Sequence, residues 1–392
     1  MTENSLSSLG IIAKNVSTAA QRQILRYYLQ SQSARLLPTE RVSQCHRALA
    51  PLREHVEVYS QPDVKRAYYH NLVVCARLWQ CPVCAARISE VRRKDIQTGL
   101  ENINNRSCLI TYTLSHYIHD DLKTVLDALL DAFRTVGQGR WWVDFAKRYG
   151  WIGSIRALEV TYGANGWHPH LHQIAFVSDE LDLVDFDEMR DELIARWSEM
   201  IQRQGRFASV AHGLTLEPTY TSVAEYVSKW GHDPSEEKWS AAREVAKASS
   251  KQASDGGLTP FQMLKNFGAG DEEAGRLFQE YVAVFKGRKQ LHWSHGLRKI
   301  MMLDEAELAD DEAAAQIPPG AKLLAELTQE QWRIVLRKKQ RGQLLEVAAK
   351  GDEQELLKWL GSLGIYPTVS VNADEFLTKA WENYHPRKKI DL

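Results

Sequence analysis

The 392-residue chain has no long uninterrupted hydrophobic run, because charged residues break each apolar stretch, as Arg77 does within residues 71–88. A membrane-spanning helix needs about 20 consecutive apolar residues, so none is predicted. The first residues lack the basic segment and the long apolar core of a secretory signal. The motifs GxxxxGKS and GxxxxGKT are also absent, which excludes a P-loop ATPase. We therefore expect a cytoplasmic protein that has no membrane partner.

Net charge is small, −1 at pH 7, but the charges are unevenly distributed along the chain. Residues 21–94 contain thirteen Lys or Arg and five Asp or Glu, whereas residues 301–392 contain twelve and sixteen. Such asymmetry suggests that the first of these segments faces an acidic partner. On charge alone, a solvated basic helix surface is the simpler explanation.

Cysteine is scarce, and four of the five cysteines lie in the first quarter of the chain. The odd number and the crowding argue against a secreted disulfide framework. Cys81-Pro-Val-Cys84 is typical of a zinc knuckle, in which two thiolates reach one tetrahedral ion. Cys45 and Cys75 would complete a set of four ligands.

Other assignments of the cysteines stay open. His46 and His70 are reserve ligands for the zinc site. A redox pair is the alternative for the CxxC motif, although no thioredoxin-like βαβ pattern accompanies it. Cys108 lies in an apolar run, and we predict that it is a buried small hydrophobe.

The periodicity of apolar residues predicts both strands and helices. Strands are expected over residues 107–115, 153–162, 167–177 and 214–219, and helices over residues 17–36, 85–100, 122–136, 187–205, 222–230 and 261–285. Composition divides the chain into a helical and zinc-binding region, a central domain, an acidic linker and a helical C-terminal region. Their predicted bounds are residues 1–100, 101–300, 301–320 and 321–392.

Three histidines alternate along the strand expected over residues 167–177: His168, His170 and His172. Side chains two positions apart in a strand share a face, so the three imidazoles point the same way. If residues 163–166 close a hairpin, Glu159 lies directly opposite His170 on the preceding strand. A carboxylate and two imidazoles then converge in a divalent-metal site.

The position of Pro169 separates the three histidines. Proline favours a strand start or an edge, so His170 and His172 are the expected ligand pair and His168 is peripheral. The alternative is an exposed polar edge strand that binds no metal.

A candidate nucleophile lies in the helix expected over residues 222–230, where Tyr226 and Lys229 share one face. A tyrosine hydroxyl with a pKa near ~10 is a weak nucleophile, but a lysine and a metal-polarised phosphate make its attack feasible. Ser222 and Glu225 form the pattern of a capping box, which explains why the helix starts there. Taken alone, Tyr226 is more often a packed tyrosine than a catalyst, and the upstream histidine strand reverses that expectation.

The order of these motifs resembles the rolling-circle plasmid replication initiators (Rep) of the HUH endonuclease superfamily. The likeness rests on the strand of residues 109–113, the His170-Leu171-His172 strand, the helix with Tyr226 and Lys229, and the upstream cysteine set. It implies an α+β fold with a palm-like antiparallel HUH sheet flanked by helices, an N-terminal zinc-binding segment and a helical C-terminal region. Residues 101–300 would be the endonuclease domain.

The activity that this resemblance implies is site-specific, single-tyrosine cleavage and transfer of single-stranded DNA. His170, His172, Glu159 and, at the periphery, His168 would hold catalytic Mg2+ or Mn2+. Tyr226 would attack the scissile phosphate, leaving a 5′-phosphotyrosyl enzyme and a free 3′-hydroxyl as primer. Lys229 would orient the metal site or the phosphate.

The resemblance also implies partners and a structural Zn2+ in the cysteine set. Single-stranded or hairpin origin DNA would contact the basic residues Arg87, Arg92, Arg93 and Lys94. A host helicase and a DNA polymerase are further partners that the resemblance implies. A homodimer is compatible with this interpretation.

One departure from the family pattern concerns termination. Some members carry a glutamate four residues before the tyrosine, where this chain has Ser222, and Tyr220 lies about 120° around the helix from Tyr226. A single-tyrosine enzyme is therefore expected, with its termination step open. The alternatives are a transposase or relaxase with the same chemistry, and a non-catalytic zinc-dependent DNA-binding protein.

Overall fold

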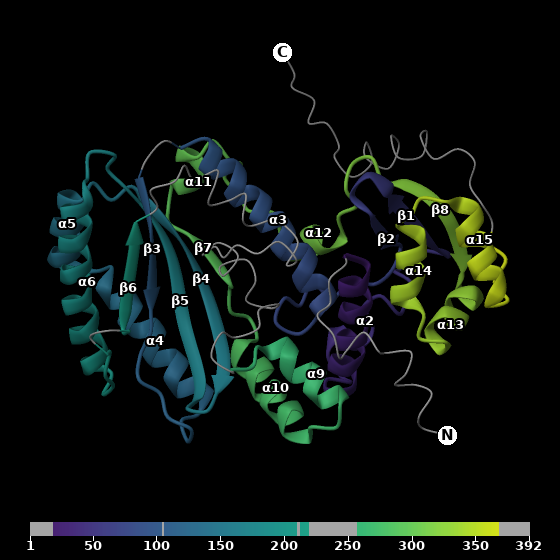
Figure 1. Ribbon diagram of the computed structural model, residues 1–392, viewed down its shortest axis with the longest axis horizontal. Coiled ribbons are helices and arrows are strands. Elements are labelled where there is room, and N and C mark those ends of the chain that lie inside the picture. The colour runs from purple at the N-terminus through teal and green to yellow at the C-terminus, as the bar shows by residue number, and fades with distance from the viewer. Residues whose placement is uncertain (1–18, 104–105, 210–211, 219–256, 368–392) are drawn as a thin grey trace, which may run out of the picture. The chain divides into compact units, whose positions relative to one another are not determined.

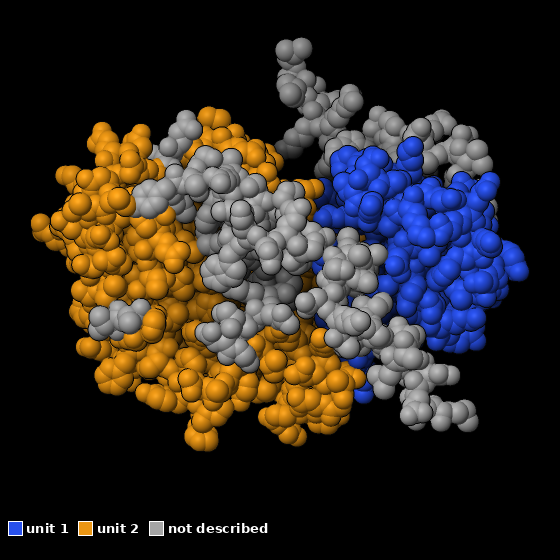
Figure 2. Space-filling view, viewed as in Figure 1, with its two compact units in different colours: residues 1–76, 314–392 blue, residues 77–313 orange. Residues whose placement is uncertain are grey.

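A computed structural model describes residues 19–103, 106–209, 212–218 and 257–367 (Figure 1). The chain falls into two compact units, residues 1–76 with 314–392 and residues 77–313 (Figure 2). Each unit is built around an antiparallel sheet. Within the described ranges, no helix has the length and apolar character needed to cross a membrane.

The larger unit, residues 77–313, contains a five-stranded sheet in the order β6-β3-β5-β4-β7. Its strands are β3 (Arg106–Tyr112), β4 (Gly153–Gly163), β5 (Gly166–Val177), β6 (Leu214–Pro218) and β7 (Leu291–Trp293). The central strand β5 pairs with β3 on one side and β4 on the other. Gly163 pairs with Gly166, so a two-residue turn joins β4 to β5.

Gly166 begins β5 in a conformation that favours glycine. Its φ is +85°, and a Cβ atom there would lie 2.8 Å from the carbonyl oxygen of Tyr117. The loop at Tyr117 therefore packs directly against the hairpin turn, which holds the start of β5 in place.

Helices cover both faces of this sheet (Figure 1). The described helices around the sheet include α3 (Pro82–Glu101), α4 (Leu122–Val136), α5 (Gly139–Arg148), α6 (Leu183–Arg203), α9 (Pro260–Gly268), α10 (Glu272–Phe285) and α11 (Leu297–Ile300). On one face, Ile174 of β5 belongs to a core cluster with Ile96 of α3 and Leu297 of α11. On the other face, the Tyr112 ring lies 5.0 Å from Phe133 of α4 and 5.1 Å from Trp197 of α6.

The smaller unit joins distant parts of the sequence in a three-stranded sheet, β2-β1-β8. Its described elements are α2 (Ala19–Leu36), β1 (His55–Gln61), β2 (Arg66–His70), β8 (Lys322–Thr328), α13 (Gln329–Arg337), α14 (Arg341–Ala348), α15 (Glu353–Ser362) and the 3-10 turns η2 (Arg41–Ser43) and η3 (Pro62–Val64). Helices α2 and α14 approach closely, because a Cβ on Gly342 would lie 2.7 Å from the Cα of Ile24. Glycine at this position lets the two backbones pack together.

The α+β class expected from the sequence is confirmed, as is the helix over residues 122–136. Other expectations need correction. The segment of residues 261–285 is two helices, because the chain turns at Gly270 with a φ of +106° and α10 restarts at its N-cap Asp271. The region of residues 321–392 is not purely helical, since it contributes β8, which pairs with β1. The acidic segment of residues 301–320 contains the short helix α12 (Asp310–Ala315).

Pro169 lies at an edge position of the sheet, as expected. Strand β5 begins at Gly166, with Val160 opposite Pro169 and Thr161 opposite His168. Pairing between β3 and β5 stops at Tyr112 and Leu171, so β5 has only one described neighbour at Pro169. A proline is tolerated on the side of a strand that carries no ladder.

Candidate functional site

Glu159, His170 and His172 meet on the face of the large sheet that also carries the core cluster of Ile174. The register sets Glu159 opposite His170, as the hairpin spacing predicts, and Ala157 opposite His172. Candidate ligand atoms of the three residues lie within 4.8 Å of one another. Glu159 Oε2 is 3.3 Å from Nε2 of His170 and 3.7 Å from Nε2 of His172.

The second ring nitrogen of each histidine is occupied elsewhere. His170 Nδ1 lies 3.2 Å from the carbonyl oxygen of His168, which only accepts, so Nδ1 carries the proton. His172 Nδ1 lies 3.0 Å from the hydroxyl of Thr111 on β3. Both rings can thus present Nε2 toward Glu159, which is the arrangement that metal-binding histidines need.

Burial and charge at Glu159 also fit a cation. Burial raises the pKa of this carboxyl, but the hydrogen bonds and charges of His170 and His172 outweigh burial and lower the pKa to about 2. The carboxylate is therefore ionised at neutral pH. Its Oε1 atom is buried without a hydrogen-bond partner among the described residues. A buried anionic oxygen of this kind, beside two imidazoles, suits a divalent ion.

His168 lies outside this group. Its ring stacks on His116 with centroids 4.7 Å apart, and its centroid is 5.1 Å from that of His170. Burial lowers the pKa of the His168 imidazole to about 3, and His170 and His116 add to the shift. His168 is thus a neutral neighbour of the group.

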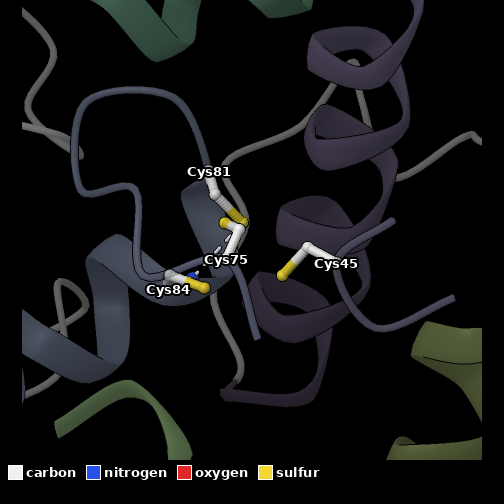
Figure 3. Close-up of side chains that lie close together, drawn as sticks. All are labelled: Cys45, Cys75, Cys81 and Cys84. Carbon is white, nitrogen blue, oxygen red and sulfur yellow. Dashed lines mark hydrogen bonds between the residues drawn. The ribbon is translucent and has the colours of Figure 1, made fainter. Parts of the chain in front are cut away.

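The four cysteines Cys45, Cys75, Cys81 and Cys84 form a second group (Figure 3). All four are buried, and their sulfur atoms lie within 4.8 Å of one another. Cys81 is the N-cap of α3, and its sulfur accepts a hydrogen bond from the Cys84 backbone N–H at 3.5 Å. Such a bond moderates the charge of a thiolate in a zinc knuckle.

Backbone pairing brings Cys45 next to Cys75. The N–H of His46 donates to the carbonyl of Val73 at 2.8 Å, and the N–H of Val73 donates to Ala48 at 2.9 Å. The residues after both cysteines are left-handed, with φ of 50° at His46 and 52° at Ala76. Non-glycine residues rarely adopt this conformation, so the surrounding hydrogen bonds hold two strained turns at the thiols.

The reserve ligands serve other contacts. His46 Nδ1 lies 2.8 Å from the Tyr27 hydroxyl, and His70 Nδ1 lies 2.7 Å from the Glu57 carboxylate. Cys108 is fully buried, as predicted, and burial raises the pKa of its thiol.

The basic residues of α3 differ in how their charge is compensated. Arg92 is ion-paired with Glu307 at 3.2 Å and with Asp310 at 2.8 Å. Arg93 pairs with Glu90 of its own helix. Arg87 is half-buried and Lys94 is exposed.

Tyr226 and Lys229 lie outside the described residues, as do Tyr220, Ser222 and Glu225. In contrast, Thr111 is a contact that sequence reasoning missed. Thr111 lies directly opposite His172 in the register of β3 and β5. The sequence could have indicated this contact only if the pairing of these two strands had been known.

Comparison with known proteins places these features in a family. The chain belongs to the family described as "Replication protein" (Rep_1), whose model matches residues 68–341. It is 27% identical over 342 residues to Protein rep of Streptomyces lividans, covering 68% of this chain and 73% of that protein. It is 28% identical over 184 residues to the Neomycin resistance protein of Streptomyces cyanogenus, covering 38% and 42%. No solved structure matches the chain.

The family match confirms the resemblance to plasmid replication initiators that the motif order indicated. As a replication protein, the chain acts on DNA.

Proposed function

We propose that the protein initiates rolling-circle replication of a plasmid by nicking single-stranded DNA at the origin. The carrying observation is the group of Glu159, His170 and His172 in a chain of the replication protein family, with Glu159 and His172 buried. Imidazole and carboxylate ligands suit a divalent ion, and such ions serve phosphate chemistry. Residues 77–313 are the proposed endonuclease unit, since they include this group and Tyr226.

Glu159, His170 and His172 would hold Mg2+ or Mn2+, which polarises the scissile phosphate when bound. Glu159 supplies the negative charge of the site because its carboxylate is ionised and buried. Thr111 keeps the His172 ring oriented through its contact with Nδ1. His168 contributes no ligand in this proposal.

Tyr226 is the proposed nucleophile. Its hydroxyl oxygen bonds to phosphorus as the bond from phosphorus to the 3′ oxygen breaks, and its proton ends on the released 3′-hydroxyl. The products are a 5′-phosphotyrosyl enzyme and a 3′ end that primes synthesis. Lys229, three residues further on, would neutralise charge at the phosphate.

The cysteine group would hold a structural Zn2+, because four closely spaced sulfur ligands leave no open coordination position for a substrate. Single-stranded or hairpin origin DNA is the proposed substrate. Lys94 is a better candidate for a phosphate contact than Arg92 and Arg93, since these two arginines already pair with carboxylates. A host helicase would unwind the duplex, and a DNA polymerase would extend the primer.

Covalent capture of DNA tests the proposal. Overlapping single-stranded oligonucleotides that tile the plasmid origin are incubated with the protein and Mn2+, then run on a denaturing gel. An oligonucleotide labelled at its 3′ end should become attached to the protein, whereas a 5′ label should leave with the 3′-hydroxyl fragment. Tyr226→Phe should abolish the adduct and keep DNA binding, and Tyr220→Phe is the matched control.

Other outcomes would replace the proposal. DNA binding with no adduct from the parent protein would indicate a non-catalytic DNA-binding protein. An adduct that persists in Tyr226→Phe would move the nucleophile elsewhere. A normal adduct with no support of plasmid replication in cells would favour the transposase or relaxase alternative.

A further inference from the structure

Arg341, the first residue of α14, is a buried cation that forms no ion pair with a carboxylate of the described residues. The residue is only 4% exposed. No aspartate or glutamate in the described ranges forms an ion pair with it, whereas the buried Arg298 of α11 pairs with Asp95 at 3.0 Å. An isolated buried charge is strongly unfavourable, so a compensating anion is expected nearby.

Neutral groups satisfy the hydrogen bonds of Arg341 but not its charge. Nη1 donates to Gln30 Oε1 at 2.6 Å and to the His46 carbonyl at 3.1 Å. Nη2 donates to the Ser31 hydroxyl at 3.1 Å, and the guanidinium lies 5.0 Å from the ring centroid of Tyr27.

A second cation lies in the same place. Arg47 donates to the same Ser31 hydroxyl at 3.1 Å, and its Nε is buried with no partner in the described part of the chain. Like Arg341, it has no ion pair with a described carboxylate. Burial lowers the pKa of Arg341 to about 10, and the charge of Arg47 adds to the shift. Two guanidiniums that share one hydroxyl repel each other, which makes the need for an anion greater.

Cys45 is the residue that can supply a negative charge next to the two arginines. Gln30, which accepts from Arg341, also donates to the carbonyl of Cys45 at 3.1 Å. The carbonyl that Arg341 contacts directly belongs to His46, the next residue. Arg47 follows Cys45 by two residues, and Arg341 contacts the backbone of His46, which lies between them. Four thiolates around one Zn2+ leave two negative charges in excess, and two arginines match them in number.

We propose that Arg341 and Arg47 are the counter-charge of the zinc-bound cysteine group, with Gln30 holding Arg341 against the Cys45 segment. This inference rests on the proposed zinc site. Both arginines are positioning residues, because they act on the thiolates and not on DNA. A cation at this place favours the deprotonated, metal-bound sulfur over the free thiol. Its removal should weaken zinc binding more than it weakens the fold.

A chelator competition on the full chain tests the proposal with zinc affinity as the readout. Arg341→Met should weaken zinc binding by about tenfold or more, the range seen when groups that support metal ligands are removed. Arg341→Lys, which keeps the charge, should lose less. Arg298→Met is the matched control, since it removes a buried arginine that already has a carboxylate, and its zinc affinity should equal that of the parent.

A second pair of variants separates charge from folding. Gln30→Glu gives Arg341 a carboxylate of nearly the same shape and loses only the hydrogen bond to the Cys45 carbonyl. Gln30→Met loses both hydrogen bonds of the Gln30 amide without adding charge. The proposal predicts weaker zinc binding in Gln30→Glu than in Gln30→Met. It also predicts that the metal-free Gln30→Glu protein loses no more thermal stability than the metal-free Gln30→Met protein. A purely structural role for Arg341 predicts that the new ion pair leaves zinc affinity unchanged or higher.

The outcomes are distinguishable from failure of the zinc site itself. The parent protein should hold about one zinc per chain after mild chelation, and Cys81→Ser should lose it while Cys108→Ala keeps it. Absence of zinc from the parent would remove the zinc site. If the parent binds zinc, and if Gln30→Glu and folded Arg341→Met bind it with unchanged affinity, the proposed role of the arginines is wrong. The zinc site itself would still stand.

Discussion

Glu159 on β4 lies directly opposite His170 on β5, and Oε2 of Glu159 is 3.3 Å from Nε2 of His170. Glu159 is buried and His170 is partly buried, at one end of a sheet face whose other end is the apolar core around Ile174. This relationship puts an ionised carboxylate where a strand of alternating histidines presents its rings. The metal proposal therefore depends on a strand register that substitutions can test.

Glu159→Gln keeps the shape of the side chain but removes its charge. We expect cleavage of an origin oligonucleotide to need at least about tenfold more Mn2+, because the site loses its anionic ligand, while DNA affinity stays unchanged. A Mn2+ titration of the cleavage rate measures this. His172→Ala should be more severe and His168→Ala milder. If Glu159→Gln needs no more Mn2+ than the parent while His168→Ala needs far more, the third ligand is His168.

Thr111→Val removes the hydroxyl that contacts Nδ1 of His172. The ring should lose its preferred tautomer and orientation, and apparent Mn2+ affinity should fall by about tenfold. Thr113→Val is the matched control on the same chain segment, because that hydroxyl donates to the His212 carbonyl instead. Equal Mn2+ titrations for the two valine variants would exclude a positioning role for Thr111.

Arg92 and Lys94 lie two positions apart on α3 but should respond differently to substitution. Arg92→Gln leaves Glu307 half-buried without its cation, and burial already raises the pKa of that carboxyl. We expect a loss of about 1–2 kcal/mol in the free energy of unfolding, less than for a fully buried pair. Urea unfolding measures it.

Lys94→Gln should leave stability near that of the parent and weaken binding of single-stranded DNA, with a smaller dependence on salt. Binding titrations at two salt concentrations measure both quantities. A larger effect of Arg92→Gln than of Lys94→Gln on DNA affinity, at equal folded fraction, would contradict the assignment.

Glu57 should make the stability of the smaller unit depend on pH in the acid range. Burial raises the pKa of this carboxyl, but its hydrogen bond and charge interaction with His70 and its hydrogen bond with Tyr59 outweigh burial and lower the pKa. A carboxyl with a lowered pKa in the fold stabilises the protein above its unfolded pKa, and this contribution disappears as pH falls through the folded value. The difference in unfolding free energy between the parent and Glu57→Gln should thus be largest above about pH 5 and shrink below pH 4.5. A constant difference across this range would contradict the ion pair.

Local signals in the sequence were sufficient to predict the hairpin and the placing of Glu159 opposite His170. Residues 163–166 allow only a short turn, and a short turn between two alternating strands sets every cross-strand pair up to Glu159 and His170. The spacing of Cys81 and Cys84 likewise predicted a knuckle, because both residues lie in one helical turn at the start of α3.

Contacts across long stretches of sequence were decided only by the tertiary structure. Thr111 meets His172 because β3 and β5 are neighbours in the sheet, and Arg341 reaches the Cys45 segment because α14 packs on α2. The strand β8 pairs with β1 across more than 250 residues, in a region where helical periodicity dominates. Periodicity and turn chemistry act over a few residues, whereas the choice of a distant partner depends on which surfaces bury each other best. The sequence by itself therefore determined which side chains meet at the hairpin, and the folded chain determined which distant residues surround and support them.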